Sequence, residues 1–131
     1  MSSATYRLLD SSVIIKHFRQ GGAYTAKLEA CEELFVPNTV LAELYAGAYR
    51  SVRQEKHLAQ IEEFIKGATL LHADEQTARH YGQISAQLAA QGTPIPQNDI
   101  WIAAGALQWG LTVATTDHHY GHVDGLSFEM W

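Results

Sequence analysis

Short apolar runs alternate with longer amphipathic stretches along most of the chain. The apolar runs have the length and composition of buried strands at residues 6–9, 34–36, 69–72 and 111–114, and residues 126–130 alternate like a last, outer strand. Between these runs, apolar residues recur at the i, i+3, i+4, i+7 spacing of a helix face. Strands that alternate with helices predict an α/β fold, with a central, mainly parallel sheet flanked by helices on both faces.

The expected helix ends carry residues with known preferences for those positions. Helices are predicted between Ser12 and Gly21 and over residues 24–30, 37–48, 53–66, 74–91 and 98–109. Ser11, Ser12 and Asp74 are good N-terminal caps, and glycines stand where four of the helices should end. The expected buried face of the longest helix comprises Ala78, Tyr81, Ser85 and Leu88.

Length and composition narrow the class of protein. The 131 residues suffice for one domain, 1–131, with a real hydrophobic core, and 47% hydrophobic with 18% charged residues excludes wholesale disorder. A single cysteine, Cys31, excludes an intrachain disulfide framework and a cysteine-based zinc site. No apolar run is long enough to span a bilayer, and the N-terminus lacks a secretory pattern. We therefore expect a soluble, cytoplasmic protein without a membrane partner.

Charge is distributed unevenly. The net charge is −5, yet residues 1–66 carry eight basic and eight acidic residues, whereas residues 67–131 carry six acids and only one basic residue, Arg79. A simple basic footprint for nucleic acid is absent. One interpretation is that these acidic residues lie on the surface and keep the protein soluble. The other is that some of them gather in a pocket, where metal ions neutralise their charge.

Four acids occupy positions that the predicted fold brings to one edge of the sheet. Asp10 and Asp117 follow strands, Asp99 lies in the first turn of the last helix, and Glu43 lies about one turn into another. Ligands of open parallel sheets bind beyond the carboxyl ends of the strands, so these side chains can converge there. Each acid alone also has an ordinary structural explanation, as a turn, helix-cap or solvated residue.

Converging carboxylates need a counter-charge. Two carboxylates about 4 Å apart repel each other by about 4 kcal/mol at an effective dielectric constant of 20, and a divalent cation removes that penalty. A set of oxygen ligands without cysteine favours Mg²⁺ or Mn²⁺ over zinc. Such a centre suits phosphate chemistry, in which a metal-activated water attacks phosphorus.

Four short segments resemble, in order, the motifs of PIN-domain ribonucleases. They are LDSSVII (residues 9–15), VLAEL (40–44), QNDIWIAA (97–104) and ATTDHHY (114–120). The resemblance covers nearly the whole chain, and the length is similar to that of VapC-type toxins of toxin–antitoxin pairs. It implies a PIN-like, three-layer α/β/α fold. Two small departures are Tyr120, where the family usually has phenylalanine, and the bulky Trp101, which we expect to narrow the substrate groove.

The resemblance also implies an activity and a site. Asp10, Glu43, Asp99 and Asp117 take the positions of the catalytic, metal-binding acids, and Ser12 and Thr115 take those of hydroxyls that support them. The implied function is a Mg²⁺- or Mn²⁺-dependent endoribonuclease that cleaves RNA, such as tRNA or rRNA loops, by metal-activated water. The implied partners are a cognate antitoxin protein and a second copy of the chain in a homodimer.

Basic residues and histidines near these motifs are harder to interpret. Five basic residues are candidates for contacts with the RNA backbone or are ordinary solvated positions: Lys16, Arg19, Arg50, Arg53 and Lys56. His118, His119 and His122 are not predicted to form a zinc site, because no thiol or carboxylate completes the set at helical spacing. Their role stays open.

Other functions also begin with an aspartate after the first strand. A phosphatase with an aspartyl nucleophile needs a second aspartate two residues on, where this chain has Ser12, and no lysine follows Lys66 to steady a phosphoenzyme. A phosphoacceptor receiver domain lacks the same late lysine. A non-catalytic, PIN-like module that binds RNA or protein is a further alternative, although it would be expected to have lost one or more of the acids.

Overall fold

The computed structural model describes residues 5–131 and contains a five-stranded sheet in the order β3-β2-β1-β4-β5. The strands are β1 (Tyr6–Leu9), β2 (Glu33–Pro37), β3 (Thr69–Leu71), β4 (Thr112–Thr115) and β5 (Phe128–Met130). Each neighbouring pair runs parallel. All five strands therefore end along one edge of the sheet. Residues that follow these strands are brought close together there.

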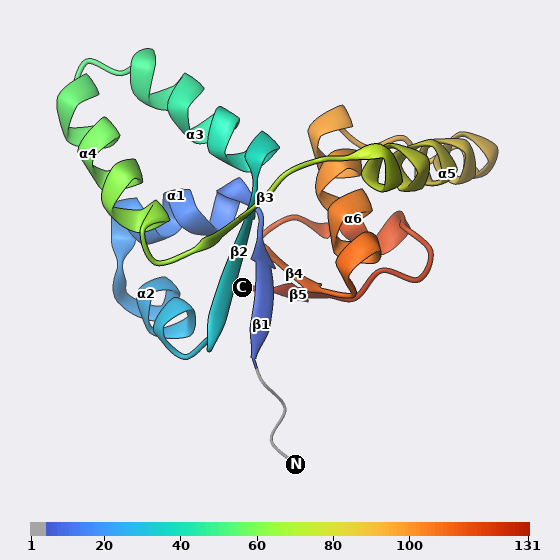
Figure 1. The fold of residues 1–131 in the computed structure, drawn as a ribbon, viewed down its shortest axis with the longest axis horizontal. Helices are drawn as coiled ribbons and strands as arrows, with labels where there is room; N and C mark the ends of the chain where they lie inside the picture. Colours follow the sequence, from blue (N-terminus) through green and yellow to red (C-terminus); the bar gives the residue numbers. More distant parts are fainter. Residues whose placement is uncertain (1–4) are drawn as a thin grey trace.

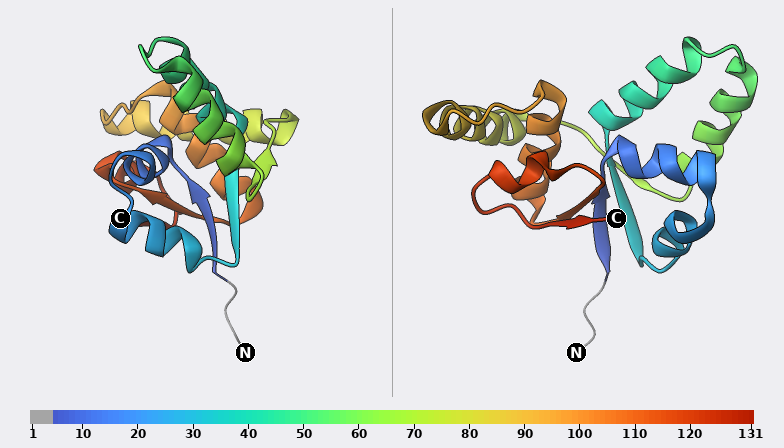
Figure 2. Two further views of the ribbon diagram at one scale, coloured as in Figure 1. Left: turned by 90° about the vertical axis from the view of Figure 1, so that its left-hand side faces the viewer. Right: turned by 180° about the vertical axis from the view of Figure 1, so that it is seen from behind.

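Helices cover both faces of the sheet. They are α1 (Ser11–Gln20), α2 (Gly22–Glu29), α3 (Asn38–Tyr49), α4 (Gln54–Ile65), α5 (Glu75–Gln91) and α6 (Gln97–Trp109), and a 3₁₀ turn, η1 (His118–His122), follows β4. Helices α1 to α4 lie on one side of the sheet and α5 and α6 on the other, in the front view and from behind (Figures 1 and 2). The predicted three-layer α/β/α architecture is confirmed.

The core lies against the central strand. In β1, Leu8 is in register with Phe35 of β2 and Val113 of β4, and Leu8 and Leu9 have no exposed surface. Burial of such side chains contributes roughly 1.5–3 kcal/mol each. Because β1 is packed on both faces and paired on both edges, the residue that follows it has a fixed position.

The start of α1 differs from the prediction. Asp10 is the residue before the helix, with extended backbone angles (φ −74°, ψ 152°) and no capping hydrogen bond from its side chain. Ser11 and Ser12 lie inside the first turn rather than at the cap. The reason is that Ser12 uses its hydroxyl to bind Asp10 instead of the helix backbone.

The buried face of α5 differs from the predicted one, and α6 is more fully buried than a helix with one apolar face. Asp74 caps α5 as predicted, by accepting from the backbone N–H of Thr77. Ala78, expected in the buried face, is exposed, and the buried residues are Thr77, Ile84 and Leu88. Helix α6 is buried over most of its circumference, because it lies between the sheet and α5. Within residues 5–131, no helix is long and apolar enough to cross a membrane.

Replacement of Ile102 with alanine tests how far α6 depends on this burial. Ile102 has no exposed surface, so the cavity should lower the free energy of unfolding by about 2–5 kcal/mol. Urea denaturation followed by circular dichroism measures the change. The matched control is Gln83→Ala at an exposed position on α5, for which we expect a change within about 0.5 kcal/mol. Equal losses in the two variants would contradict the role given to α6.

Candidate active site

One cavity at the carboxyl edge of the sheet is lined by all four acids singled out above. Asp10 follows β1 and Asp117 lies two residues beyond β4, whereas Glu43 and Asp99 come from α3 and α6. The lining residues are Asp10, Ser11, Ser12, Glu43, Pro96, Gln97, Asn98, Asp99 and Asp117. The cavity therefore draws its acids from four separate elements on both sides of the sheet.

Asp10 is the most firmly held of these acids. Its side chain is buried, and one oxygen, Oδ2, accepts hydrogen bonds from Thr115 Oγ1 at 2.7 Å and Ser12 Oγ at 3.0 Å. Both hydroxyls also accept from the segment after β4: Thr115 from Asp117 N at 2.9 Å and Ser12 from Thr116 N at 3.2 Å. Ser12 and Thr115 thus lock the two strand ends together and fix the orientation of the Asp10 carboxylate.

Two of the acids are electrostatically unfavourable as charged groups. Burial raises the pKa of Glu43, and the negative charges of Asp10 and Asp99 add to the rise. Burial likewise raises the pKa of Asp99, together with the charges of Asp10 and Asp117. Glu43 Oε1 is buried and makes no hydrogen bond with any residue that the structure describes. No cation among residues 5–131 offsets the rise in the pKa of Glu43, whereas His119 opposes part of the rise in the pKa of Asp99.

His119 lies in the same site, which sequence reasoning missed. Its Nδ1 lies 2.9 Å from Asp117 Oδ2 and 3.3 Å from Asp99 Oδ2, and its backbone N–H donates to Asp117 Oδ1. The unpredicted 3₁₀ turn η1 places it there. The available signal was the spacing, because an aspartate often accepts from the backbone N–H two residues on. His118 and His122 are exposed.

Tyr120 adds a buried hydroxyl beneath these acids. Its side chain has no exposed surface, and its hydroxyl makes no hydrogen bond among residues 5–131. Burial raises the pKa of Tyr120, and the negative charges of Asp10 and Asp99 raise it further. The phenol therefore stays protonated and faces the acids.

A groove between α1, α3 and α4 adjoins the acid cavity and shares Glu43 with it. Its lining residues are Ile15, Phe18, Arg19, Glu43, Leu44, Gly47, Ala48, Ser51, Lys56, His57, Gln60 and Ile61. Two of the five candidate RNA contacts, Arg19 and Lys56, therefore lie in this groove. Lys16, Arg50 and Arg53 are not part of its lining.

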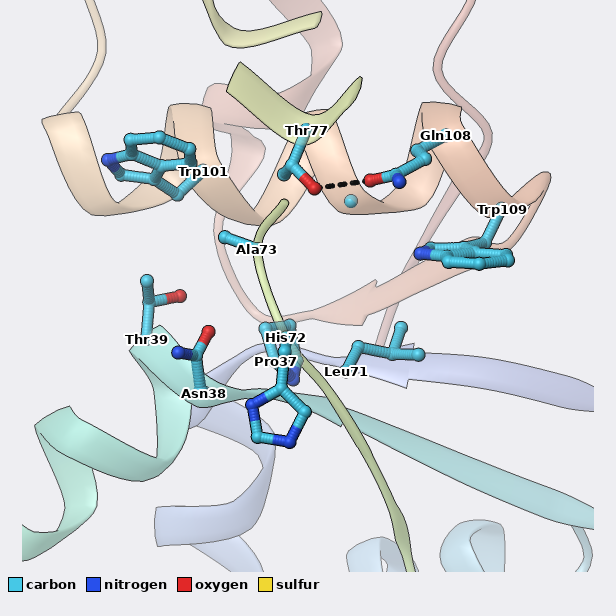
Figure 3. Close-up of a pocket in the computed structure, with 11 residues that line it drawn as sticks. Pro37, Asn38, Thr39, Leu71, His72, Ala73, Thr77, Trp101, Gln108 and Trp109 are labelled. Carbon is cyan, nitrogen blue, oxygen red and sulfur yellow. Dashed lines mark hydrogen bonds between the residues drawn. The ribbon is translucent and has the colours of Figure 1, made fainter. Parts of the chain in front are cut away.

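Trp101 lies away from the acid cavity, contrary to the expectation that it narrows the substrate groove. Its ring packs on Tyr81 with centroids 4.5 Å apart. It lines a separate, small cavity with Trp109 and His72, in which Thr77 donates a hydrogen bond to Gln108 (Figure 3). Asp99 and Trp101, two residues apart on α6, therefore serve different surfaces, because such a spacing turns side chains to different sides of a helix.

A comparison of the sequence with known protein families identifies the family of this chain. The sequence matches the PIN domain over residues 7–126. The chain belongs to the PIN domain family.

Similar proteins narrow this PIN domain further. Ribonuclease VapC2 of Haemophilus influenzae is 37% identical over 100 residues, which cover 76% of each chain. The tRNA(fMet)-specific endonuclease VapC of Salmonella typhimurium is 38% identical over 97 residues, 73% of this chain and 74% of that one. The chain therefore belongs to the VapC ribonucleases.

Solved structures share the fold over nearly their full length. DNA-bound VapBC from Salmonella typhimurium has a TM-score of 0.89 at 30% identity and covers 98% of this chain and 99% of that one. VapBC2 from Rickettsia felis, bound to a DNA fragment from its promoter, has a TM-score of 0.90 at 21% identity, with 97% and 99% covered. This PIN domain thus has the same fold as the matching chains of these VapBC structures.

Replacement of Glu43 with glutamine should stabilise the metal-free protein at neutral pH, because it removes a charge that faces Asp10 and Asp99. The pKa of Glu43 is raised above its ordinary 4.5, so the folded state binds this proton more tightly than the unfolded chain. The stability gained from the proton is fully present below the ordinary pKa and is lost as the pH rises through the raised one.

Thermal unfolding in EDTA, at a series of pH values between 4.5 and neutral pH, measures this change in stability. The Tm of Glu43→Gln should exceed that of the wild type at neutral pH, and the two should converge towards pH 4.5. Saturating Mg²⁺ should raise the Tm of the wild type more than that of the variant. A wild type that is the more stable protein in EDTA at neutral pH would contradict the strain assigned to Glu43.

Proposed function

We propose that this PIN domain is the toxin of a toxin–antitoxin pair and hydrolyses RNA with the help of Mg²⁺ or Mn²⁺. The observation that carries the proposal is the convergence of Asp10, Glu43, Asp99 and Asp117 on one cavity. Four carboxylates in one place are costly without a cation, and the raised pKa values of Glu43 and Asp99 are a sign of that cost.

The residues present fit a hard divalent cation. Glu43 Oε1 is a buried oxygen without a hydrogen-bond partner in the described part of the chain, and unpaired buried oxygens are natural ligands for such an ion. Asp10, Glu43, Asp99 and Asp117 would hold it, and when bound it supplies Lewis-acid activation of water and charge stabilisation at phosphorus. We infer one centre built from all four acids.

The protein's own groups prepare this chemistry by orientation. Because Asp10 Oδ2 accepts from both Thr115 and Ser12, Oδ1 is the Asp10 oxygen left for the cavity. Asp117 uses Oδ1 to accept from the backbone of His119, which directs its Oδ2 towards Asp99 and the ring of His119. Holding these oxygens in advance lowers the cost of organising the site during reaction.

RNA is the substrate that we propose, with tRNA as the first candidate. The support is the Salmonella relative, a tRNA(fMet)-specific endonuclease, together with the groove beside Glu43 that carries Arg19 and Lys56. A groove with basic residues can hold a phosphate backbone and lead it to the acids.

We also propose a cognate antitoxin and a homodimer as partners. The support for the antitoxin is the likeness to VapBC structures. For the homodimer, the support is a set of large apolar side chains that stay exposed: Tyr6, Tyr49, Val52, Trp109 and Met130. Covering apolar side chains removes them from water, which favours the association of two chains.

Asp10→Asn tests the reaction. The amide keeps the shape but loses the charge that holds the cation, so RNA cleavage should fall by about 100-fold or more, as measured by the rate of product formation on a tRNA pool. The matched control is Asp124→Asn, an exposed acid outside the cavity, which should cleave like the wild type.

EDTA should abolish cleavage by the wild type, and added Mn²⁺ should restore it. Circular dichroism establishes that Asp10→Asn is folded. Unchanged cleavage by the folded variant would overturn the proposed function.

Arg19→Ala and Lys56→Ala test the groove. Each should weaken binding of single-stranded RNA and reduce the slope of log affinity against log salt by about 0.7, because each removes one phosphate contact. Fluorescence anisotropy over a salt series in EDTA measures both quantities without cleavage. The control is Arg79→Ala, on α5 in the opposite layer, and a change of slope equal to that of Arg19→Ala would contradict the assignment.

A further inference from the structure

The ring of His119 stands between two of the acids, with its Nδ1 close to a carboxylate oxygen of each. One oxygen of Asp117 lies 2.9 Å and one of Asp99 lies 3.3 Å from its Nδ1. Nδ1 carries at most one hydrogen, so it can serve one of these two acceptors well. Asp117 and His119 belong to one local turn at the start of η1, whereas the fold brings Asp99 to them from α6.

The spacing of these atoms matches a coordination shell. One ligand atom from each of Asp99, Asp117 and His119 can be chosen so that all lie within 4.8 Å of one another. In an octahedral shell with bonds of about 2.1 Å, adjacent ligand atoms lie about 3 Å apart. The distances from Nδ1 to the two carboxylates are close to that value.

Two further buried polar atoms, independent of His119, lie near these acids. The hydroxyl of Tyr120, a side chain without exposed surface, makes no hydrogen bond within the described residues and lies under the influence of Asp10, Asp99 and Asp117. Glu43 Oε1 is also buried without such a partner. Buried polar atoms without a protein partner beside a cluster of carboxylates indicate a ligand there.

We propose that His119 binds the divalent cation through Nδ1, as a nitrogen ligand beside Asp99 and Asp117 in the four-acid centre, and so shifts the preference of the site from Mg²⁺ towards Mn²⁺. The proposal rests on the proposed function and adds a nitrogen ligand to it. Mg²⁺ prefers oxygen ligands, whereas imidazole nitrogen favours the first-row transition metals. A nitrogen in place of a water oxygen therefore strengthens Mn²⁺ binding more than Mg²⁺ binding.

Electron paramagnetic resonance of Mn²⁺ tests this directly on the full chain. Pulsed spectra of the wild type with Mn²⁺ should contain the modulation of a directly bound ¹⁴N nucleus, and His119→Gln should lose it. The dissociation constant for Mn²⁺, from the signal of the free ion, should rise about tenfold in His119→Gln. That for Mg²⁺, from competition, should change by less than about twofold.

The matched control is His118→Gln, the neighbouring exposed histidine, which should keep both the nitrogen modulation and the affinity. The side chain of His119 is 46% exposed, so loss of folding is not expected, and His119→Asn serves as a second variant. Wild-type spectra without bound nitrogen, or unchanged Mn²⁺ affinity in both His119 variants, would overturn the proposal.

Asp99→Asn separates this inference from the proposed function. If Asp99→Asn loses Mn²⁺ and the His119 variants bind it like the wild type, the acid centre stands and the role of His119 is wrong. If the wild type itself binds no Mn²⁺, both proposals fail together.

Discussion

Mutual repulsion among carboxylates is the constraint around which this site is arranged. A parallel sheet sends the carboxyl ends of β1 and β4 to the same edge, and α3 and α6 place Glu43 and Asp99 beside them. Two like charges about 4 Å apart repel each other by about 4 kcal/mol at an effective dielectric constant of 20. The rest of the molecule must hold these groups together against that cost, and it does so with the buried central strand β1 and the enclosed helix α6.

The two sides of the cavity differ in how firmly they are held. Asp10 is buried and fixed by two hydroxyls, one of them the fully buried Thr115. His119 lies on the short 3₁₀ turn η1 and Asp117 directly precedes it, and nearly half of the His119 side chain is exposed to solvent. Asp10 is therefore held more firmly than this pair, because it is buried and two hydroxyls donate to its carboxylate.

The asymmetry of charge along the sequence becomes an asymmetry of the two helical layers. Every lysine belongs to residues 1–66, which supply the layer of α1 to α4, and the groove with Arg19 and Lys56 lies in that layer. The opposite layer of α5 and α6 has Arg79 as its basic residue. An acidic chain can therefore still present a local basic surface to a polyanion, because the field near a groove depends on the nearest charges more than on the net charge.

Local sequence determined the order of strands and helices, the parallel sheet and the positions of Asp10, Asp99 and Asp117 at strand or helix ends, because hydrophobic periodicity and residues that end helices act over a few positions. Contacts between distant segments were decided only by the tertiary structure. Ser12 binds Asp10 rather than capping α1, Ala78 is exposed, and Trp101 lines a cavity that Asp99 does not. The place of His119 is of the same kind: it depends on how η1 packs against α6, and no periodicity within either segment encodes the distance between them.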